Sequence, residues 1–102
     1  MNNIDWEELF DDRMNVFHCE TEEIANELLS IAHNLGHKWV SGGSYLDYNN
    51  WQFNKENTCY WIYHRTYEHI EEFLSRENRQ TYNIINVKEL LYGRKPFKLN
   101  RK

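Results

Sequence analysis

The chain contains five histidines and two cysteines, the side chains that most often bind zinc or act as nucleophile and base. They are His18, Cys19, His33, His37, Cys59, His64 and His69. Structural zinc sites use close ligand pairs on one element. Here Gly36, at an expected helix end, separates His33 from His37, and the adjacent His18 and Cys19 point to opposite faces of an expected strand. We therefore predict no metal site and no cofactor.

Nucleophilic catalysis would need a cysteine or serine beside a base that a third group orients. Cys59 and His64 are on one expected strand, at positions that face opposite sides of a regular sheet. The chain has no Gly-Xaa-Ser-Xaa-Gly segment and no glycine-rich phosphate loop. The paired acids at 11–12 and 71–72 fit solvated helix faces better than general acid–base pairs. The sequence predicts that the protein is not an enzyme.

Cys19 and Cys59 form no Cys-Xaa-Xaa-Cys pair. A cytosolic chain keeps its thiols reduced, so we expect two buried thiols. A disulfide between them would require the strands that carry them to be neighbours.

Charge is distributed unevenly along the chain. Residues 1–30 contain nine acidic side chains and one basic side chain, a net charge of −8, whereas residues 94–102 contain five basic side chains and no acid. One interpretation is a solvated acidic helix face with a basic, flexible tail. The other is an acidic face that meets a basic partner, because a surface of one sign steers association. Direct binding of nucleic acid by the acidic body is disfavoured.

The composition is that of a small folded domain. The 102 residues fit one domain, and 16% of them are aromatic, which favours an aromatic core despite a mean hydropathy of −0.90. No apolar run approaches the roughly 20 residues that span a bilayer. The N-terminal segment lacks the basic and apolar regions of a signal peptide. We expect a soluble, cytoplasmic protein.

The sequence contains N-capping residues for two helices. Asp5 and Glu8 form a capping box for a short first helix. Thr21 can cap a helix over 22–35, which carries one apolar stripe and ends at Gly36, where a left-handed residue belongs.

The rest of the chain reads as short strands and one further helix. We expect strands at 14–19, 38–41, 59–64 and 82–87, a long loop or distorted strand over 43–58, a second helix over 67–77 capped by Thr66, and a helical turn at 88–91. The predicted fold class is α+β: an antiparallel or mixed sheet of about four strands with both helices on one face. A single domain covers 1–93 and a basic tail covers 94–102.

The apolar stripe of the main helix predicts which side chains meet in the core. Ile24, Leu28, Ile31 and Leu35 should bury against the sheet. The sheet residues expected opposite them are Val16, Trp39, Ile62 and Ile84.

A set of residues in the first half of the chain carries a resemblance. They are His18, Cys19, Thr21, Glu22, Glu23, Gly36 and Trp39. On these residues the stretch 16–87 resembles a loose group of small proteins carried by phages and prophages of low-GC Gram-positive bacteria. The group shares no activity. What the resemblance implies is a setting, that of an accessory phage gene, a class that includes inhibitors of host defence systems.

The segment 43–58, called the aromatic loop below, places Tyr45, Tyr48, Trp51 and Phe53 among asparagines. We expect half or more of these rings to pack over the sheet as a lid. Exposed tyrosine and tryptophan side chains make effective binding anchors because they bring large contact area at low entropic cost.

The leading functional hypothesis is a non-enzymatic phage accessory protein that inhibits a host protein with a basic surface, such as a defence nuclease, in the manner of an anti-CRISPR protein. The predicted partner-binding residues are Glu20, Glu22, Glu23, Glu27, Tyr48 and Trp51.

Two alternatives remain open. A protein that binds small molecules or signalling nucleotides would stack a base on Trp51 and Tyr60, with Arg65 or Lys55 supplying positive charge. A homodimer would pair the strand 59–64 with its copy, if that strand lies at a sheet edge.

Overall fold

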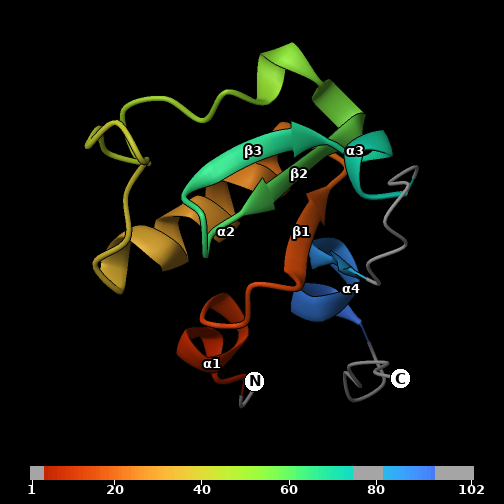
Figure 1. Cartoon of the computed structure of the whole chain (residues 1–102), viewed down its shortest axis with the longest axis horizontal. Coiled ribbons are helices and arrows are strands. Elements are labelled where there is room, and N and C mark those ends of the chain that lie inside the picture. The colour runs from red at the N-terminus through yellow and green to blue at the C-terminus, as the bar shows by residue number, and fades with distance from the viewer. Residues whose placement is uncertain (1–3, 75–81, 94–102) are drawn as a thin grey trace.

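The computed structural model describes residues 4–74 and 82–93 (Figure 1). Its strands are β1 (Asn15–Cys19), β2 (Thr58–Trp61), β3 (Thr66–His69) and β4 (Asn83–Asn86). Its helices are α1 (Trp6–Phe10), α2 (Glu22–Asn34), α3 (Glu71–Leu74) and α4 (Val87–Tyr92), with 3₁₀ turns η1 (Trp51–Phe53) and η2 (Lys55–Asn57). The strands form one mixed sheet in the order β3-β2-β1-β4, in which only the β1–β4 pair is parallel. This confirms the predicted α+β class. The predicted basic tail 94–102 lies outside the described residues.

Local signals place the starts of α1 and α2 and the end of α2 correctly. The Thr21 hydroxyl accepts a hydrogen bond from the backbone N–H of Ile24 at 3.2 Å and begins α2. Gly36 follows the helix with φ +94°, the left-handed conformation that a glycine adopts without strain. The Asp5 carboxylate likewise accepts from the N–H of Glu8 at 3.1 Å and begins α1.

Two predicted elements are wrong. The segment 38–41 is not a strand: Trp39 lies in a turn, where its N–H donates to the Gly43 carbonyl at 3.0 Å. The segment that begins at Thr66 is strand β3 rather than the start of a helix over 67–77, and within that range only Glu71–Leu74 is helical in the described part. Arg65, with φ +61°, turns the chain back so that β3 pairs antiparallel with β2.

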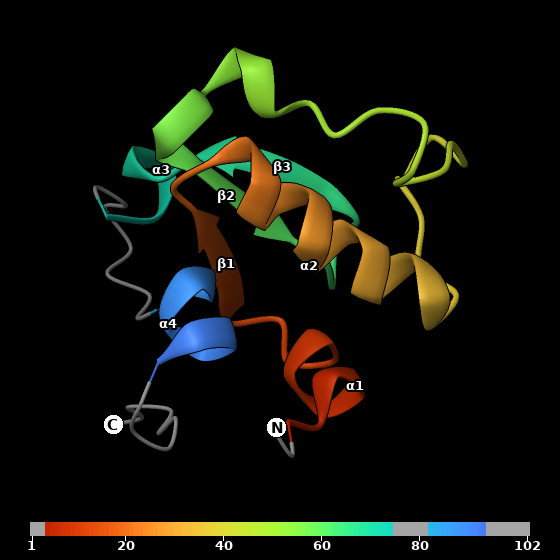
Figure 2. The same ribbon diagram turned by 180° about the vertical axis from the view of Figure 1, so that it is seen from behind.

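The main core lies between α2 and one face of the sheet (Figure 2). As predicted, Ile24 and Leu28 are buried in it. Its sheet side is formed by Phe17, Tyr60 and Ile85. The sequence assigned Val16 and Ile84 to this core, which is wrong, because each neighbours an inward-facing residue along its strand and therefore points to the opposite face.

Of the other four residues predicted for this core, two are buried in it and two are not. Trp39 and Ile62 are buried in the main core as predicted. Ile31 is only partly buried and Leu35 is 39% exposed, so the end of the apolar stripe extends beyond the sheet. The expected burial of Leu35 is therefore wrong.

The second face of the sheet carries a smaller aromatic cluster that includes Phe73 of α3, so the prediction that both helices lie on one face is wrong. Trp61 meets Phe73 of α3 and Tyr82 edge-on, with ring centroids 5.2 and 5.5 Å apart. The Trp61 indole N–H donates to the carbonyl of Arg13 at 2.7 Å. Val16 and Cys59 are buried in this cluster.

Within residues 4–74 and 82–93, no helix combines the length and the apolar character that crossing a membrane requires.

Candidate protein-binding surface

The candidate surface is centred on the outward face of α2. Figure 2 shows α2 lying across the sheet, with the aromatic loop along one flank and α4 and α1 on the other side. Glu20, Glu22, Glu23 and Glu27 are all exposed. Along a helix of 3.6 residues per turn, Glu22 and Glu27 fall on opposite flanks and Glu23 lies on the ridge between them. The structure therefore spreads three of the predicted glutamates around the N-terminal half of α2, and Glu20 lies just before its N-cap.

The aromatic loop is fastened to one flank of α2 by Asn49. The Asn49 amide donates to Glu22 Oε2 at 3.0 Å and to Asn26 Oδ1 at 2.8 Å. Its own Oδ1 accepts from the backbone N–H of Trp51 at 2.9 Å. The Asn49 carbonyl accepts from the Tyr60 hydroxyl at 2.8 Å, which anchors the loop to the buried face of β2. Asn49 thus brings Glu22 close to the segment that carries both predicted aromatic residues.

On the other flank, α4 and its N-cap residue Asn86 supply partners for two of the glutamates. The Tyr92 hydroxyl donates to both carboxylate oxygens of Glu27, at 2.5 and 2.6 Å. The Asn86 amide donates to Glu20 Oε2 at 3.2 Å. Tyr92 is 59% exposed, so it adds an aromatic ring beside the glutamates that the sequence did not predict. No local pattern points to it, because the bond joins positions 65 residues apart.

The two predicted aromatic anchors differ in how accessible they are. Tyr48 is 46% exposed and stacks on Trp39, with the ring planes 8° apart. Trp51 is partly buried against the main core, and its indole N–H donates to the Cys19 carbonyl at 3.3 Å. Tyr45 is buried, whereas Phe53 is 62% exposed. The loop is therefore both a lid over the core and an exposed surface, and Tyr48 is the more accessible anchor.

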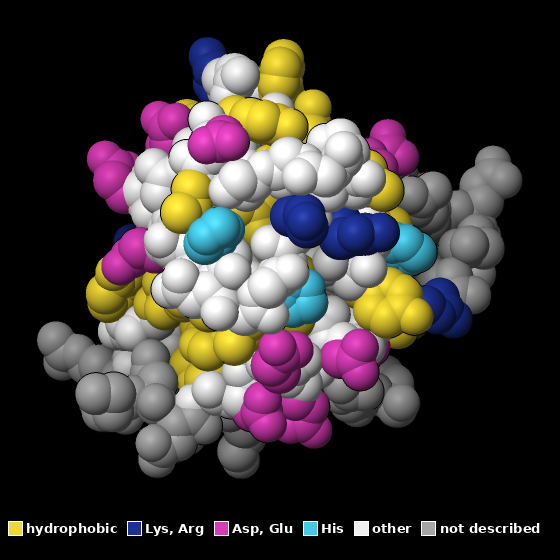
Figure 3. All heavy atoms as spheres, turned by 90° about the vertical axis from the view of Figure 1, so that its left-hand side faces the viewer, with side chains coloured by type: hydrophobic (Ala, Val, Ile, Leu, Met, Phe, Trp, Pro, Cys, Tyr) yellow, Lys and Arg dark blue, Asp and Glu magenta, His cyan; other side chains and the backbone are white. Residues whose placement is uncertain are grey.

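Acidic and basic side chains are distributed unevenly over the surface of the described residues. Residues 4–74 and 82–93 contain fifteen acidic and only five basic side chains. The five are Arg13, Lys38, Lys55, Arg65 and Lys88. Figure 3 shows another face, on which Lys, Arg and His side chains gather in the middle and Asp and Glu lie mainly toward its edges. The sign of the surface charge therefore differs between faces: the outward face of α2 is acidic, whereas the face in Figure 3 presents Lys, Arg and His side chains in its middle.

The cysteines are placed where they are chemically inert. Cys19 and Cys59 lie on the neighbouring strands β1 and β2, but they point to opposite faces of the sheet and both are free thiols. Burial raises the pKa of the Cys59 thiol to about 12. Burial, and then the nearby Cys59, raises the pKa of Cys19 well above its ordinary value. Both side chains are therefore protonated at neutral pH.

The histidines also have separate surroundings. His18 Nε2 lies 2.7 Å from the Glu56 carbonyl, and His33 Nδ1 lies 3.5 Å from the Ser44 hydroxyl. His69 Nδ1 accepts from the N–H of Glu71. Within the described ranges, no group of three or more His, Cys, Asp or Glu side chains is arranged to hold a metal ion.

The structure bears on both alternative functions: one expected residue role is wrong, and the condition for the other is not met. Tyr60 is fully buried, so it cannot stack on a nucleobase. Strand β2 lies between β1 and β3, and its edges are therefore already paired and cannot join a second copy.

Comparison of the chain with protein-family models, curated proteins and solved structures gives no match.

Proposed function

We propose that this chain is a non-enzymatic binding protein that uses the acidic face of α2 to occupy a basic surface of a partner protein. The observation that carries the proposal is the arrangement of three exposed glutamates on the N-terminal half of α2 and a fourth, Glu20, just before its N-cap, flanked by the accessible rings of Tyr48 and Tyr92. Carboxylates attract a basic partner and set its orientation, whereas aromatic rings supply contact area.

The partner surface that fits best is one that binds nucleic acid. Such surfaces present Lys and Arg side chains in a row that neutralises phosphates. A helix that carries glutamates on successive turns offers negative charge at comparable spacing, so it competes for the same side chains. Binding would therefore inhibit the partner by exclusion, without any chemical step.

The biological setting belongs to the same proposal. The stretch 16–87 resembles accessory proteins of phages and prophages on seven residues between His18 and Trp39. In that setting the chain acts in the cytoplasm of the host cell, and its partner is a host defence nuclease, as for an anti-CRISPR protein.

The test is a pull-down from a lysate of a low-GC Gram-positive bacterium with two matched variants. The double variant Glu23→Lys/Glu27→Lys reverses charge on α2, and Glu56→Lys/Glu68→Lys makes the same change in charge elsewhere. We expect the wild type and the second variant to capture the same protein, which excess duplex DNA releases. The first variant should lose it, and the loss should be greatest at low salt. Capture of no protein, or equal capture by both variants, would refute the proposal.

A further inference from the structure

The apolar stripe of α2 continues past the sheet. Ile24 and Leu28 are buried, but Ile31 is only partly buried and Leu35 is 39% exposed. Ile31 and Leu35 are one turn apart and lie on the same side of the helix. The second half of the stripe therefore faces something other than the sheet.

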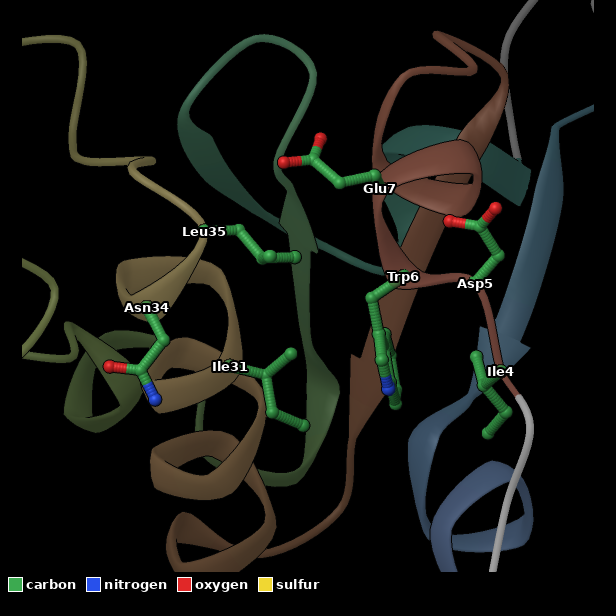
Figure 4. A pocket seen from close by; sticks show the side chains of 7 residues that line it. All are labelled: Ile4, Asp5, Trp6, Glu7, Ile31, Asn34 and Leu35. Atoms are coloured by element: carbon green, nitrogen blue, oxygen red, sulfur yellow. The ribbon is translucent and has the colours of Figure 1, made fainter.

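That part of the stripe forms one wall of an open groove, and α1 forms the other. The groove has a volume of about 480 Å³. It is lined by Ile4, Asp5, Trp6, Glu7, Ile31, Asn34 and Leu35. Figure 4 shows Ile31 and Leu35 directed from α2 toward Trp6. Trp6 is only partly buried, with its ring centroid 5.6 Å from that of Phe10, so its indole is both supported by the core and open to the groove.

The charged groups of the groove are acidic. The lining residues include Asp5 and Glu7 but no Lys, Arg or His. Outside the lining, His37 Nε2 lies 3.7 Å from Glu7 Oε1. Glu27 comes one helical turn before Ile31, so the acidic face of α2 leads directly to the groove.

We propose that this groove receives the apolar side of a basic amphipathic helix, which belongs to the partner that the proposed function requires. Leucine-like side chains of that helix pack against Trp6 and Leu35, and its lysines and arginines face Asp5, Glu7 and Glu27. The acidic rim favours such a segment over an acidic one of the same shape. A half-open tryptophan in the centre of an apolar groove is a typical energetic anchor for helix-in-groove recognition. The inference rests on the proposed function and adds the shape of the partner.

The probe is a synthetic Leu–Lys peptide of roughly five helical turns with its leucines on one face. Two comparison peptides have the same leucine positions with Glu in place of Lys, or the same composition in scrambled order. The full chain is labelled with fluorotryptophan, so that each of its four tryptophans gives a fluorine NMR signal. The Trp6 signal is assigned by Trp6→Phe.

We expect the amphipathic Leu–Lys peptide to shift the Trp6 signal and the other two peptides to leave it unchanged. Leu35→Gln should weaken binding roughly tenfold, because it removes an apolar contact in the groove. Leu74→Gln, at a 60% exposed leucine on α3, is the matched control and should leave the affinity unchanged. The charge variant Asp5→Asn/Glu7→Gln keeps the N-cap of α1, since asparagine caps as well as aspartate. It should weaken binding about threefold at low salt and have no effect near 1 M salt.

An unshifted Trp6 signal, equal binding of the Leu–Glu peptide, or equal effects of Leu35→Gln and Leu74→Gln would each overturn this proposal. The pull-down tests the proposed function independently of this groove. If capture of the lysate protein still requires Glu23 and Glu27 while the Trp6 signal does not shift with the peptide, α2 binds the partner and the groove does not.

Discussion

The side-chain amide of Asn49 donates to Glu22 Oε2 at 3.0 Å, which joins the aromatic loop to the first turn of α2. The same residue also bonds Trp51 and Tyr60. The position of the candidate aromatic anchors relative to the candidate glutamates therefore depends on one uncharged residue, Asn49, through its side-chain amide and its backbone carbonyl.

Replacing Asn49 with alanine should release the loop from α2. The change removes the bonds to Glu22 and Asn26 and leaves the N–H of Trp51 without its side-chain acceptor. We expect a loss of about 1–2 kcal/mol in the free energy of unfolding, measured by urea titration. Asn26→Ala, which removes one of these bonds and improves helix propensity, should cost less. A larger loss for Asn26→Ala would show that Asn49 is not the residue that holds the loop.

Core and surface positions of α2 should respond very differently to substitution. Leu28 is fully buried, so Leu28→Ala should cost about 2–5 kcal/mol through the cavity it leaves, out of a total stability of roughly 5–15 kcal/mol. Glu23→Gln should cost only a few tenths of a kcal/mol, through a weaker interaction with the helix dipole. Comparable losses in urea titration would mean that α2 does not face the sheet as described.

The contrast between α2 and β3 shows which parts of this fold can be read from sequence. The start and end of α2 are set by neighbours along the chain, Thr21 and Gly36, so they are visible locally. The segment from Thr66 has an equally good helix cap and helical apolar spacing. It forms a strand because Arg65 adopts a left-handed conformation and β2 offers an unpaired edge, and neither fact follows from the residue types in the segment.

The same distinction applies to the candidate surface. The acidic run around Glu22 is visible in the sequence, and its exposure follows from the apolar stripe of the helix. The bonds that organise the surface join Asn49 to Glu22 and Tyr92 to Glu27, across 27 and 65 positions. Asparagine and tyrosine occur in many roles, so only the tertiary structure distinguishes these two from the others.

The thiols of Cys19 and Cys59 should be unreactive in the folded protein. Burial keeps both protonated, and only the thiolate attacks a disulfide reagent. With Ellman's reagent near neutral pH we expect labelling no faster than unfolding, and prompt reaction of both thiols in urea. Because folding raises these pKa values, the buried thiols stabilise the fold fully below the ordinary thiol pKa of about 8.5, and this contribution declines at higher pH. Rapid labelling of either cysteine in native buffer would contradict the burial described.

The contribution of Tyr92 to the free energy of unfolding should decrease at alkaline pH. A phenylalanine at this position has no hydroxyl to titrate and cannot produce this change. The hydrogen bond to Glu27, then desolvation and the charge of Glu27, raise the pKa of the Tyr92 hydroxyl above 10. The protonated hydroxyl is the donor, so its contribution is fully present below the pKa of an unfolded tyrosine, about 10, and is lost as the pH rises through the higher folded value. In urea titrations, the wild type should exceed Tyr92→Phe by a constant amount up to about pH 9, and the difference should then shrink as the pH rises. Tyr63→Phe, at another exposed tyrosine, should show no such trend. A difference between wild type and Tyr92→Phe that does not change with pH would mean that Tyr92 and Glu27 are not bonded in solution, and α4 would then not hold that flank of the candidate surface.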